Sequence, residues 1–504
     1  MHYVSLIVEF LRGRPTLVFW GAALSQAALW VIFPWLFFSA PPGDVPVLLA
    51  VGHELRLGSY LGAPLAFWFG ELAFRIAGEF GLYVLAQACV VTAFWAVFDL
   101  GRMIVGTRHA ALAVLLMTGI AAFSLPSVEF GPAVLAMPLW ALALNYYWRA
   151  SGDDGRGYWY LLALDLGLLL LTTYAGVILL ALLLVYSLAT QRGRQAFAEA
   201  EPWLAALLLL IVVFPHGVWL TDRWPAVLPT LVGARSGDWW TASATRFVST
   251  IVVVHLGLAL LTVMASRWRA PRNERVPAID RNPAPRTARS FVYFFALAPA
   301  LAAVALLAGL GHVAPLERVA PFIVLSGLLV ITLAGDRVLI YRERIVSFSW
   351  LGLLVVPPVL TVLSLILLPW IVASDLQAAQ PAAAMGRFFA DSFQRRTGKP
   401  LSIVAGDDHL ASLIALAAPS RPTVYFDRRP EHSPWVNADL IRRNGAVLVW
   451  RASESDATPP AALKAQFPEL SPEVPRAFAR AVQGRLPLIR IGWAMIRPQA
   501  EPAK

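Results

Sequence analysis

Long apolar runs separated by short polar loops dominate the chain. A bilayer core about 30 Å thick needs roughly 20 apolar residues in a helix to cross it. We therefore expect a polytopic α-helical membrane protein with about eleven transmembrane helices, of which the fifth and sixth are separated by only a short gap. The candidate spans are 17–39, 80–101, 109–125, 131–148, 158–174, 176–190, 203–220, 247–266, 290–311, 319–335 and 346–373.

Basic residues in the loops predict the orientation of these spans, because cytoplasmic loops carry an excess of Lys and Arg. With a retained first span and with Arg12 and Arg14 inside, every loop on the cytoplasmic side is basic. Residues 44–68, 125–130 and 374–504 are then extracytoplasmic, as expected for a multi-pass protein of a bacterial inner (plasma) membrane. The cytoplasmic loops in this orientation are 101–109, 149–157, 191–202, 267–289 and 336–344.

The pattern changes after residue 373. The runs LSIVAG, TVYFD, AVLVW and LPLIRIGW are typical of short strands, and residues 408–417 and 472–482 are expected to be helical between them. This alternation predicts a small C-terminal α/β domain at 374–504, outside the membrane, after a transmembrane domain at 1–373.

Composition supports a membrane protein: 58% of residues are hydrophobic, 14% are charged, and the mean hydropathy is +0.64. Soluble domains carry about 25% charged residues. The net charge of +10 follows from the basic loops, so no nucleic-acid partner is expected. Cys89 is the single cysteine, which excludes an intrachain disulfide and a Cys-based metal site. No metal site is expected elsewhere, and Asp407-Asp408-His409 is more typical of a helix cap.

The segment 44–68 places charges beside apolar sequence, where they are costly and usually functional. Asp44 is the main candidate, and its alternative role is to cap a helix that starts at Val45. Residues 63–79 predict an amphipathic helix in the outer interface, with Glu71 and Arg75 spaced to pair on one face. The alternative for 63–79 is an extension of the next span.

Asp44 is followed by an L-x-L-G element at Leu55–Gly58, then by Pro64-Leu65 and by Trp68. Further elements appear in order along the chain. In this order and spacing the elements resemble those of bacterial polyprenyl-phosphate-dependent glycosyltransferases of the GT-C fold, related to aminoarabinose transferases and protein O-mannosyltransferases (glycosyltransferase family 39). The later elements are Phe130, Pro138–Trp140, Tyr158–Gly176, Pro215-His216 with Trp219, Pro434-Trp435 and Gly445–Trp450.

Several polar positions of that family are altered. Val45 replaces the second acid of a D-E pair, Gly62-Ala63-Pro64 replaces H-P-P, Gly131 and Ala133 replace two Asn, and Thr173 replaces a Lys. Either the substrate differs or activity is weakened or lost, so a degenerate, non-catalytic relative is an alternative. A transporter is less favoured, because the spans show few ionisable or Gly/Pro-broken midspan segments.

The resemblance implies transfer of a sugar, with inversion, from a polyprenyl-phosphate donor to an extracytoplasmic acceptor such as lipid A, a surface glycan or another lipid. The lipid-linked sugar is the donor substrate, and no cofactor is assigned. Asp44 would be the general base, while Glu129 would assist it or bind the acceptor. Glu54 is a further substrate-binding candidate, with a solvated loop acid as its alternative. Candidate phosphate ligands, each alternatively a snorkelling side chain, are Arg56, Arg75, Arg246 and Arg318.

Overall fold

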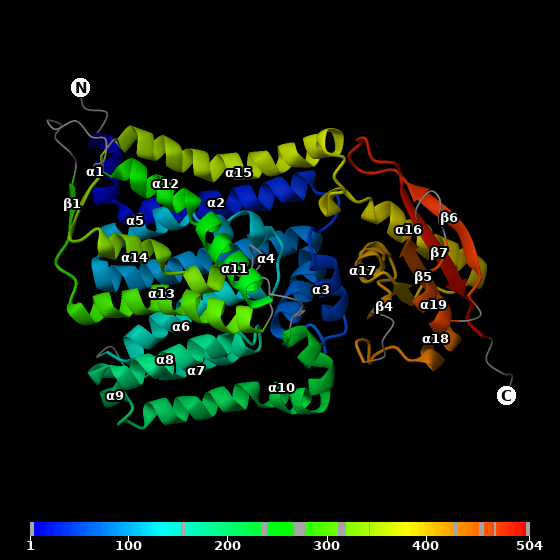
Figure 1. The fold of residues 1–504 in the computed structure, drawn as a ribbon, viewed down its shortest axis with the longest axis horizontal. Coiled ribbons are helices and arrows are strands. Elements are labelled where there is room, and N and C mark those ends of the chain that lie inside the picture. The colour runs from blue at the N-terminus through cyan, green and yellow to red at the C-terminus, as the bar shows by residue number, and fades with distance from the viewer. Residues whose placement is uncertain are drawn as a thin grey trace. The chain divides into compact units, whose positions relative to one another are not determined.

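A computed structural model (Figure 1) divides the chain into two compact units. The first unit comprises Met1–Pro34 and Leu82–Leu360, and the second comprises Trp35–Gly81 and Thr361–Lys504. The predicted boundary at residue 373 stays a prediction; by its contacts, the C-terminal segment groups with the first predicted loop. The structure describes residues 5–152, 155, 157–232, 239–266, 278–310, 319–341, 343–426, 431–452, 458–467 and 470–499.

The first unit is mostly helical, and its helices α2, α4 and α15 continue into the second unit. A two-stranded antiparallel ribbon joins β1 (Ala278–Asp280) to β2 (Arg337–Leu339). The helical elements are α1 (Ser5–Gly13), α2 (Pro15–Phe37), α4 (Leu65–Val105), α5 (Thr107–Met117), η1 (Ala121–Phe123), η2 (Leu125–Val128), α6 (Pro132–Ala150), α7 (Gly157–Leu170), α8 (Gly176–Ala189), α9 (Gln191–Ala196), α10 (Glu201–Leu231), α11 (Trp239–Val254), α12 (Leu256–Ala265), α13 (Arg286–Gly309), η5 (Ala320–Ile323), α14 (Ser326–Leu333) and α15 (Glu343–Ile371).

Within the described residues, each of the eleven predicted spans overlaps one or more helices. Within the described ranges, five helices are long and apolar enough to cross a membrane, or up to seven if each of two bent pairs is one span. Further predicted spans coincide with shorter apolar helices, such as α7 and α8. The chain is therefore a multi-pass membrane protein, and the total of eleven spans stays a prediction.

A buried polar cluster lies near the C-terminal end of α4, within the first unit. Asp99 is buried and lies 2.6 Å from Arg102 and 2.9 Å from the Asn145 amide nitrogen, and it also pairs with Arg149. These charges lie in or beside two loops that the sequence places in the cytoplasm, 101–109 and 149–157. The cluster lets the carboxylate stay buried because each oxygen has a cationic partner.

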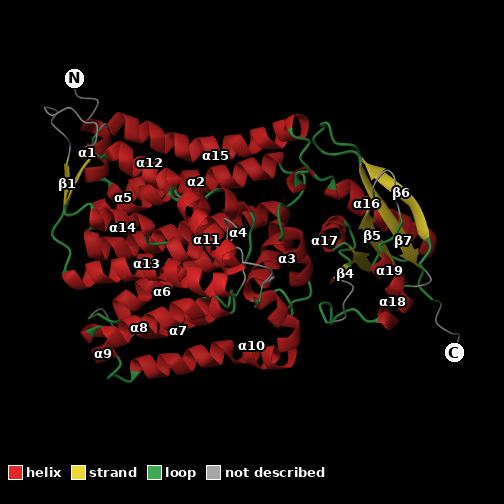
Figure 2. Ribbon diagram, viewed as in Figure 1, coloured by secondary structure: helices red, strands yellow, loops and turns green. Residues whose placement is uncertain are grey.

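The second unit combines a short helix of the first predicted loop with a five-stranded mixed sheet (Figure 2). The strand order is β4-β3-β5-β7-β6, with parallel pairing of β3 to β4 and β5 and antiparallel pairing of β7 to β5 and β6. The elements are α3 (Val45–Gly52), η6 (Gln377–Ala379), α16 (Ala382–Thr397), β3 (Ile403–Gly406), α17 (Asp408–Ala417), β4 (Thr423–Tyr425), α18 (Ala438–Asn444), β5 (Ala446–Arg451), α19 (Ala461–Gln466), β6 (Pro472–Phe478) and β7 (Ile489–Ile496).

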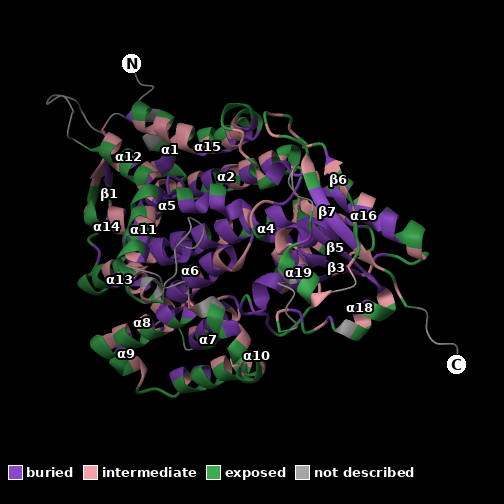
Figure 3. Ribbon diagram, turned by 45° about the vertical axis from the view of Figure 1, so that its right-hand side comes forward, coloured by how far each residue is buried: buried purple, intermediate pink, exposed green. Residues whose placement is uncertain are grey.

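Helices cover both faces of this sheet, because successive strand residues point to opposite sides. Ile403, Leu448 and Trp450 face the side that packs on residues of α18 and α19. On the other side, Trp493 of β7 contacts Phe389 of α16, with ring centroids 5.6 Å apart. The purple colour of β5 and β7 in Figure 3 marks this buried centre, as expected for strands covered on two faces.

The helix predicted for residues 472–482 is wrong, because residues 472–478 form the edge strand β6. The exposed fraction alternates along β6, and Pro472 and Pro475 interrupt any helical hydrogen-bonding pattern. Proline is tolerated at a sheet edge, where an amide N–H is not needed on the outer side. The pairing with β7 shifts register between Glu473 and Arg476, around Pro475.

The predicted amphipathic helix is separated from the following span by a break in α4. Ala77 and Gly78 have non-helical backbone angles, and Gly78 has φ of +60°, which favours glycine. Before the break, Phe69, Leu72 and Ile76 form an exposed apolar stripe at helical spacing. The segment is thus a helix in its own right rather than an extension of the next span.

Candidate functional site

Asp44 stands at the start of α3 with its side chain exposed. It occupies the N-cap position, yet its carboxylate makes no capping hydrogen bond, so the alternative of a structural cap is wrong. The backbone before it is held from outside the loop: the Gly43 N–H donates to Gln377 Oε1 over 3.0 Å. Gly43 has φ of +58°, a conformation that favours glycine. The loop thus fixes the backbone while leaving the Asp44 carboxylate exposed.

Helix α3 is apolar and buried, and it packs against α17 of the C-terminal segment. Its close packing also requires Gly52, since a Cβ there would lie 2.4 Å from the carbonyl oxygen of Phe67. Two segments more than 350 residues apart in sequence therefore form one local structure around Asp44.

His409 in the first turn of α17 lies near Asp44. Burial lowers the pKa of His409, and the positive charge of Arg451 lowers it further. The negative charges of Asp407, Asp44 and Asp375 act in the opposite direction. Its Nε2 is buried without a hydrogen-bond partner among the described residues. A largely buried imidazole therefore lies within electrostatic range of the exposed Asp44 carboxylate.

Asp407 caps α17, as the sequence predicts. Its Oδ1 accepts a hydrogen bond of 2.9 Å from the Leu410 N–H, which satisfies one unpaired donor of the first turn. In the part of the chain that the structure describes, no group of three or more His, Cys, Asp and Glu residues could hold a metal ion.

Glu71 is the most heavily paired carboxylate of the first loop region. Its side chain is 1% exposed; Oε1 accepts from Arg75 Nε over 2.8 Å and lies 3.1 Å from His53 Nδ1, and Oε2 accepts from Arg421 over 2.7 Å. The predicted pairing of Glu71 with Arg75 is thereby confirmed. Arg421 also lies 4.8 Å from the centre of the Phe74 ring. This cluster ties the predicted loop and its amphipathic helix to the C-terminal segment.

Glu54 and Arg56 lie in the turn after α3. Burial raises the pKa of Glu54 above its usual value. A hydrogen bond with Thr423 and the charges of His53 and Arg56 act in the opposite direction. One Glu54 oxygen is buried without a partner among the described residues. The Arg56 side chain is exposed, while its carbonyl accepts a 2.8 Å hydrogen bond from the Trp68 indole. This hydrogen bond anchors the loop backbone at Arg56 and leaves its guanidinium exposed.

The structure brings four of the sequence-predicted residues into the second unit: Asp44, Glu54, Arg56 and Arg75. Glu129, partly exposed at the end of η2, and Arg246, exposed on α11, belong to the first unit. Arg318 lies outside the described residues. Their assigned roles stay predictions.

Sequence reasoning missed Arg421, His53 and Gln377 as parts of this region. Arg421 lies in a Ser-Arg-Pro turn with φ of +47°, and it reaches Glu71 across 350 positions of sequence. No spacing rule links residues that far apart. The available signal in the sequence was Glu71 itself. A buried acid in an apolar helix needs more partners than the single exposed Arg75.

Comparison with known proteins gives the fold. A family described as dolichyl-phosphate-mannose-protein mannosyltransferase matches residues 62–219, a stretch that begins after Asp44. No curated protein sequence matches the chain.

Solved structures match along nearly the whole length. The crystal structure of ArnT from Cupriavidus metallidurans bound to undecaprenyl phosphate is 14% identical, with a TM-score of 0.60 over 97% of this chain and 99% of that chain. ArnT of the same organism in the apo state is 15% identical, with a TM-score of 0.58 over 95% and 97%. The chain therefore resembles the GT-C glycosyltransferases and has the fold of ArnT over 97% of its length.

Proposed function

We propose that this membrane protein is a glycosyltransferase that moves a sugar from a polyprenyl-phosphate donor to an extracytoplasmic acceptor: lipid A, a surface glycan or another lipid. The observation that carries the proposal is an exposed Asp44 carboxylate, free of a capping role, on a fixed loop of an ArnT-like fold. Undecaprenyl phosphate, which is bound in the crystal structure of ArnT, supports a lipid-linked donor.

In this reaction Asp44 removes the proton from the acceptor hydroxyl. The acceptor oxygen forms a bond to the anomeric carbon, and the bond from that carbon to the phosphate oxygen breaks. The polyprenyl phosphate leaves with the electron pair, and the configuration inverts. A base of this kind must lie within hydrogen-bond reach of the hydroxyl, which an exposed carboxylate permits.

Cationic groups stabilise the departing phosphate. Arg56, with an exposed guanidinium on a fixed backbone, is the best candidate of the four arginines. Arg75 directs its Nε to Glu71, so its main role in this proposal is to hold the amphipathic helix. Arg246 and Arg318 remain candidates from sequence, as do Glu129 and Glu54 for acceptor binding.

The proposed topology has eleven spans in a bacterial inner membrane, with a cytoplasmic N-terminus and a periplasmic C-terminal α/β segment from residue 374. The exposed stripe of Phe69, Leu72 and Ile76 suits a helix lying in the outer interface. Its paired face, with Glu71 and Arg75, then faces away from lipid.

The alternative is a non-catalytic relative, favoured by the apolar replacements at Val45 and at Gly131 and Ala133. The test compares envelope glycolipids, by mass spectrometry, in cells that lack the protein and carry wild type, Asp44→Asn or Asp391→Asn. Asp391 is an exposed acid on α16 and serves as the matched control.

A sugar restored by wild type and Asp391→Asn but not by Asp44→Asn would support the proposal. Restoration by all three would rule out Asp44 as the base. An unchanged profile of lipids and of surface glycans in every strain would favour the non-catalytic relative.

A further inference from the structure

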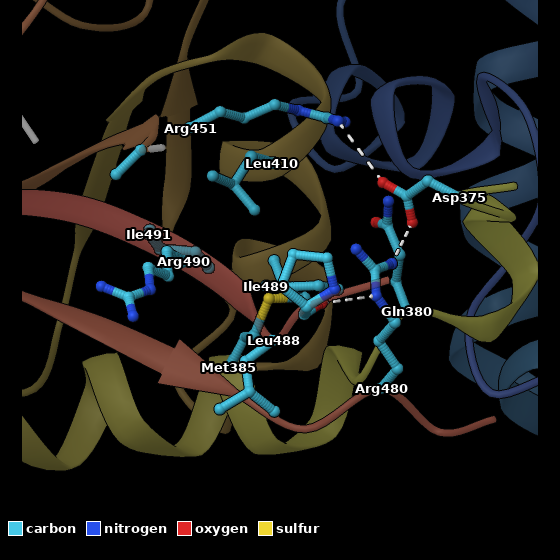
Figure 4. Close-up of a pocket in the computed structure, with 12 residues that line it drawn as sticks. Asp375, Gln380, Met385, Leu410, Arg451, Arg480, Leu488, Ile489, Arg490 and Ile491 are labelled. Atoms are coloured by element: carbon cyan, nitrogen blue, oxygen red, sulfur yellow. Dashed lines mark hydrogen bonds and ion pairs between the residues drawn. The ribbon is translucent and has the colours of Figure 1, made fainter. Parts of the chain in front are cut away.

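The second unit contains a pocket of about 200 Å³ that is rich in arginine (Figure 4). Arg451 at the end of β5, Arg480 after β6 and Arg490 in β7 line it, together with Asp375. Arg451 and Arg480 share the single carboxylate of Asp375, which leaves an excess of positive charge in the lining. An arginine-rich pocket of this kind attracts an anion.

Asp375 orients two of the arginines. It pairs with Arg480 and lies 3.7 Å from Arg451, so the two guanidinium groups approach it from opposite sides, as Figure 4 shows. Arg480 Nε also donates to the carbonyl of Pro487 over 3.1 Å. A guanidinium has five N–H donors, so these contacts use only part of the donor capacity of each group.

The pocket lies at the end of the last long apolar helix. Trp370, Ile371 and Val372 at the end of α15 are 51%, 63% and 67% exposed, as expected for side chains that face lipid. Tryptophan favours the level of the lipid headgroups. Asp375 follows Val372 by three residues, which places the pocket at or just beyond that level.

The loop from β6 to β7 is docked on the same helix end. The Arg485 N–H donates to the Pro369 carbonyl over 2.9 Å, and Gly484 packs so closely that a Cβ would lie 2.5 Å from the Pro369 Cβ. The position of the pocket relative to the end of α15 is therefore fixed by backbone contacts, not by mobile side chains.

We propose that this pocket binds the phosphate of an anionic lipid headgroup at the membrane surface. Arginine matches phosphate oxygens with paired N–H donors, and these charge-assisted hydrogen bonds are strong. A headgroup is the source that the position favours, because the pocket adjoins lipid-facing residues. The proposal does not depend on the transferase activity.

The test measures lipid binding to the full-length protein in detergent, by native mass spectrometry. The probes are phosphatidylglycerol, phosphatidylcholine and inorganic phosphate. The variants are Arg451→Gln and Arg451→Gln/Arg490→Gln, and the control is Arg443→Gln, which removes an exposed charge of α18 that does not line the pocket.

Phosphatidylglycerol should bind more tightly than phosphatidylcholine, and Arg451→Gln should weaken it roughly tenfold, the effect of one lost charge-assisted hydrogen bond. The double variant should weaken it further, and the control should not. Equal affinity for the two lipids, or equal loss in the control, would overturn the proposal. Full competition by phosphate at the same concentration as the lipid would assign the pocket to free phosphate instead.

Discussion

Glu71 and Arg421 form an ion pair of 2.7 Å across 350 positions of sequence, and the carboxylate is almost completely buried. The pair fixes the amphipathic helix of the first loop to the turn before β4. Because α3 also packs on α17, the first loop and the C-terminal segment are joined both by apolar burial and by paired charge. Any movement of this loop must carry the C-terminal segment with it or break a buried charge pair.

Replacing either partner of this pair should destabilise the second unit. Removing one member of a buried pair is costly because the other charge stays buried, typically by roughly 3 kcal/mol or more. We expect less for Arg421→Gln, since Arg75 and His53 still face Glu71, and more for Glu71→Gln. Thermal unfolding in detergent measures both, and the double variant should lose less than the sum of the single variants. Strict additivity would contradict a direct interaction.

Asp44→Asn should reduce transfer without affecting folding. Loss of a general base lowers rates by about 10²–10⁴-fold, whereas a carboxylate that makes no capping bond contributes little to stability. The measurement pairs transferase assays on purified protein with its melting temperature. A lower melting temperature with unchanged specific activity would reverse the assignment and make Asp44 structural.

Asp407→Ala should have the opposite profile. Its side chain does cap α17, so its removal should cost about 1 kcal/mol, a typical value for an N-cap. Thermal unfolding should show a lower melting temperature than in Asp44→Ala, which loses no cap. Equal melting temperatures of the two variants would show that the α17 cap does not contribute to stability.

The melting temperature should fall on acidification in a way that depends on His409. Its pKa is lowered from 6.5 in the folded chain, so below that value the unfolded chain binds more protons. Stability therefore rises with pH between the folded and the unfolded pKa, and is constant above about pH 7.5. Asp44, Asp407, Asp375 and Arg451 surround the group and are unchanged in His409→Gln. Wild type should lose more stability than this variant between pH 7.5 and 5.5; parallel curves would contradict the prediction.

Single cysteines can test the proposed topology, because the native Cys89 is buried. Lys399→Cys, in an exposed turn after α16, should react with a membrane-impermeant maleimide in spheroplasts. Arg337→Cys, in the exposed strand β2 within the segment 336–344 that the basic-residue rule places inside, should react only after permeabilisation. The reverse pattern would invert the topology.

Local patterns predicted local structure well. Apolar length located the helices, and the runs around Ile403, Val424, Leu448 and Ile491 became β3, β4, β5 and β7. The spacing of Glu71 and Arg75 gave their pairing, since residues four apart on a helix are neighbours. Each of these predictions depended on interactions within a few residues.

The structural features that the sequence did not predict depend on contacts between distant segments. The helix expected for residues 472–482 is not formed, because residues 472–478 pair with β7 as the edge strand β6. Arg421 and Gln377 joined the first loop through the tertiary fold alone. The arginine pocket likewise unites residues from four separate segments, so no sequence motif predicted it.

The two edges of the sheet make the C-terminal segment a poor template for pairing with other chains. Pro472 and Pro475 remove two amide donors from β6, and the irregular register between Glu473 and Arg476 disturbs the flat edge that a foreign strand would need. The opposite edge, β4, is only three residues long. Because an unpaired edge strand invites aggregation, these two edges protect the sheet from pairing with the sheets of neighbouring molecules.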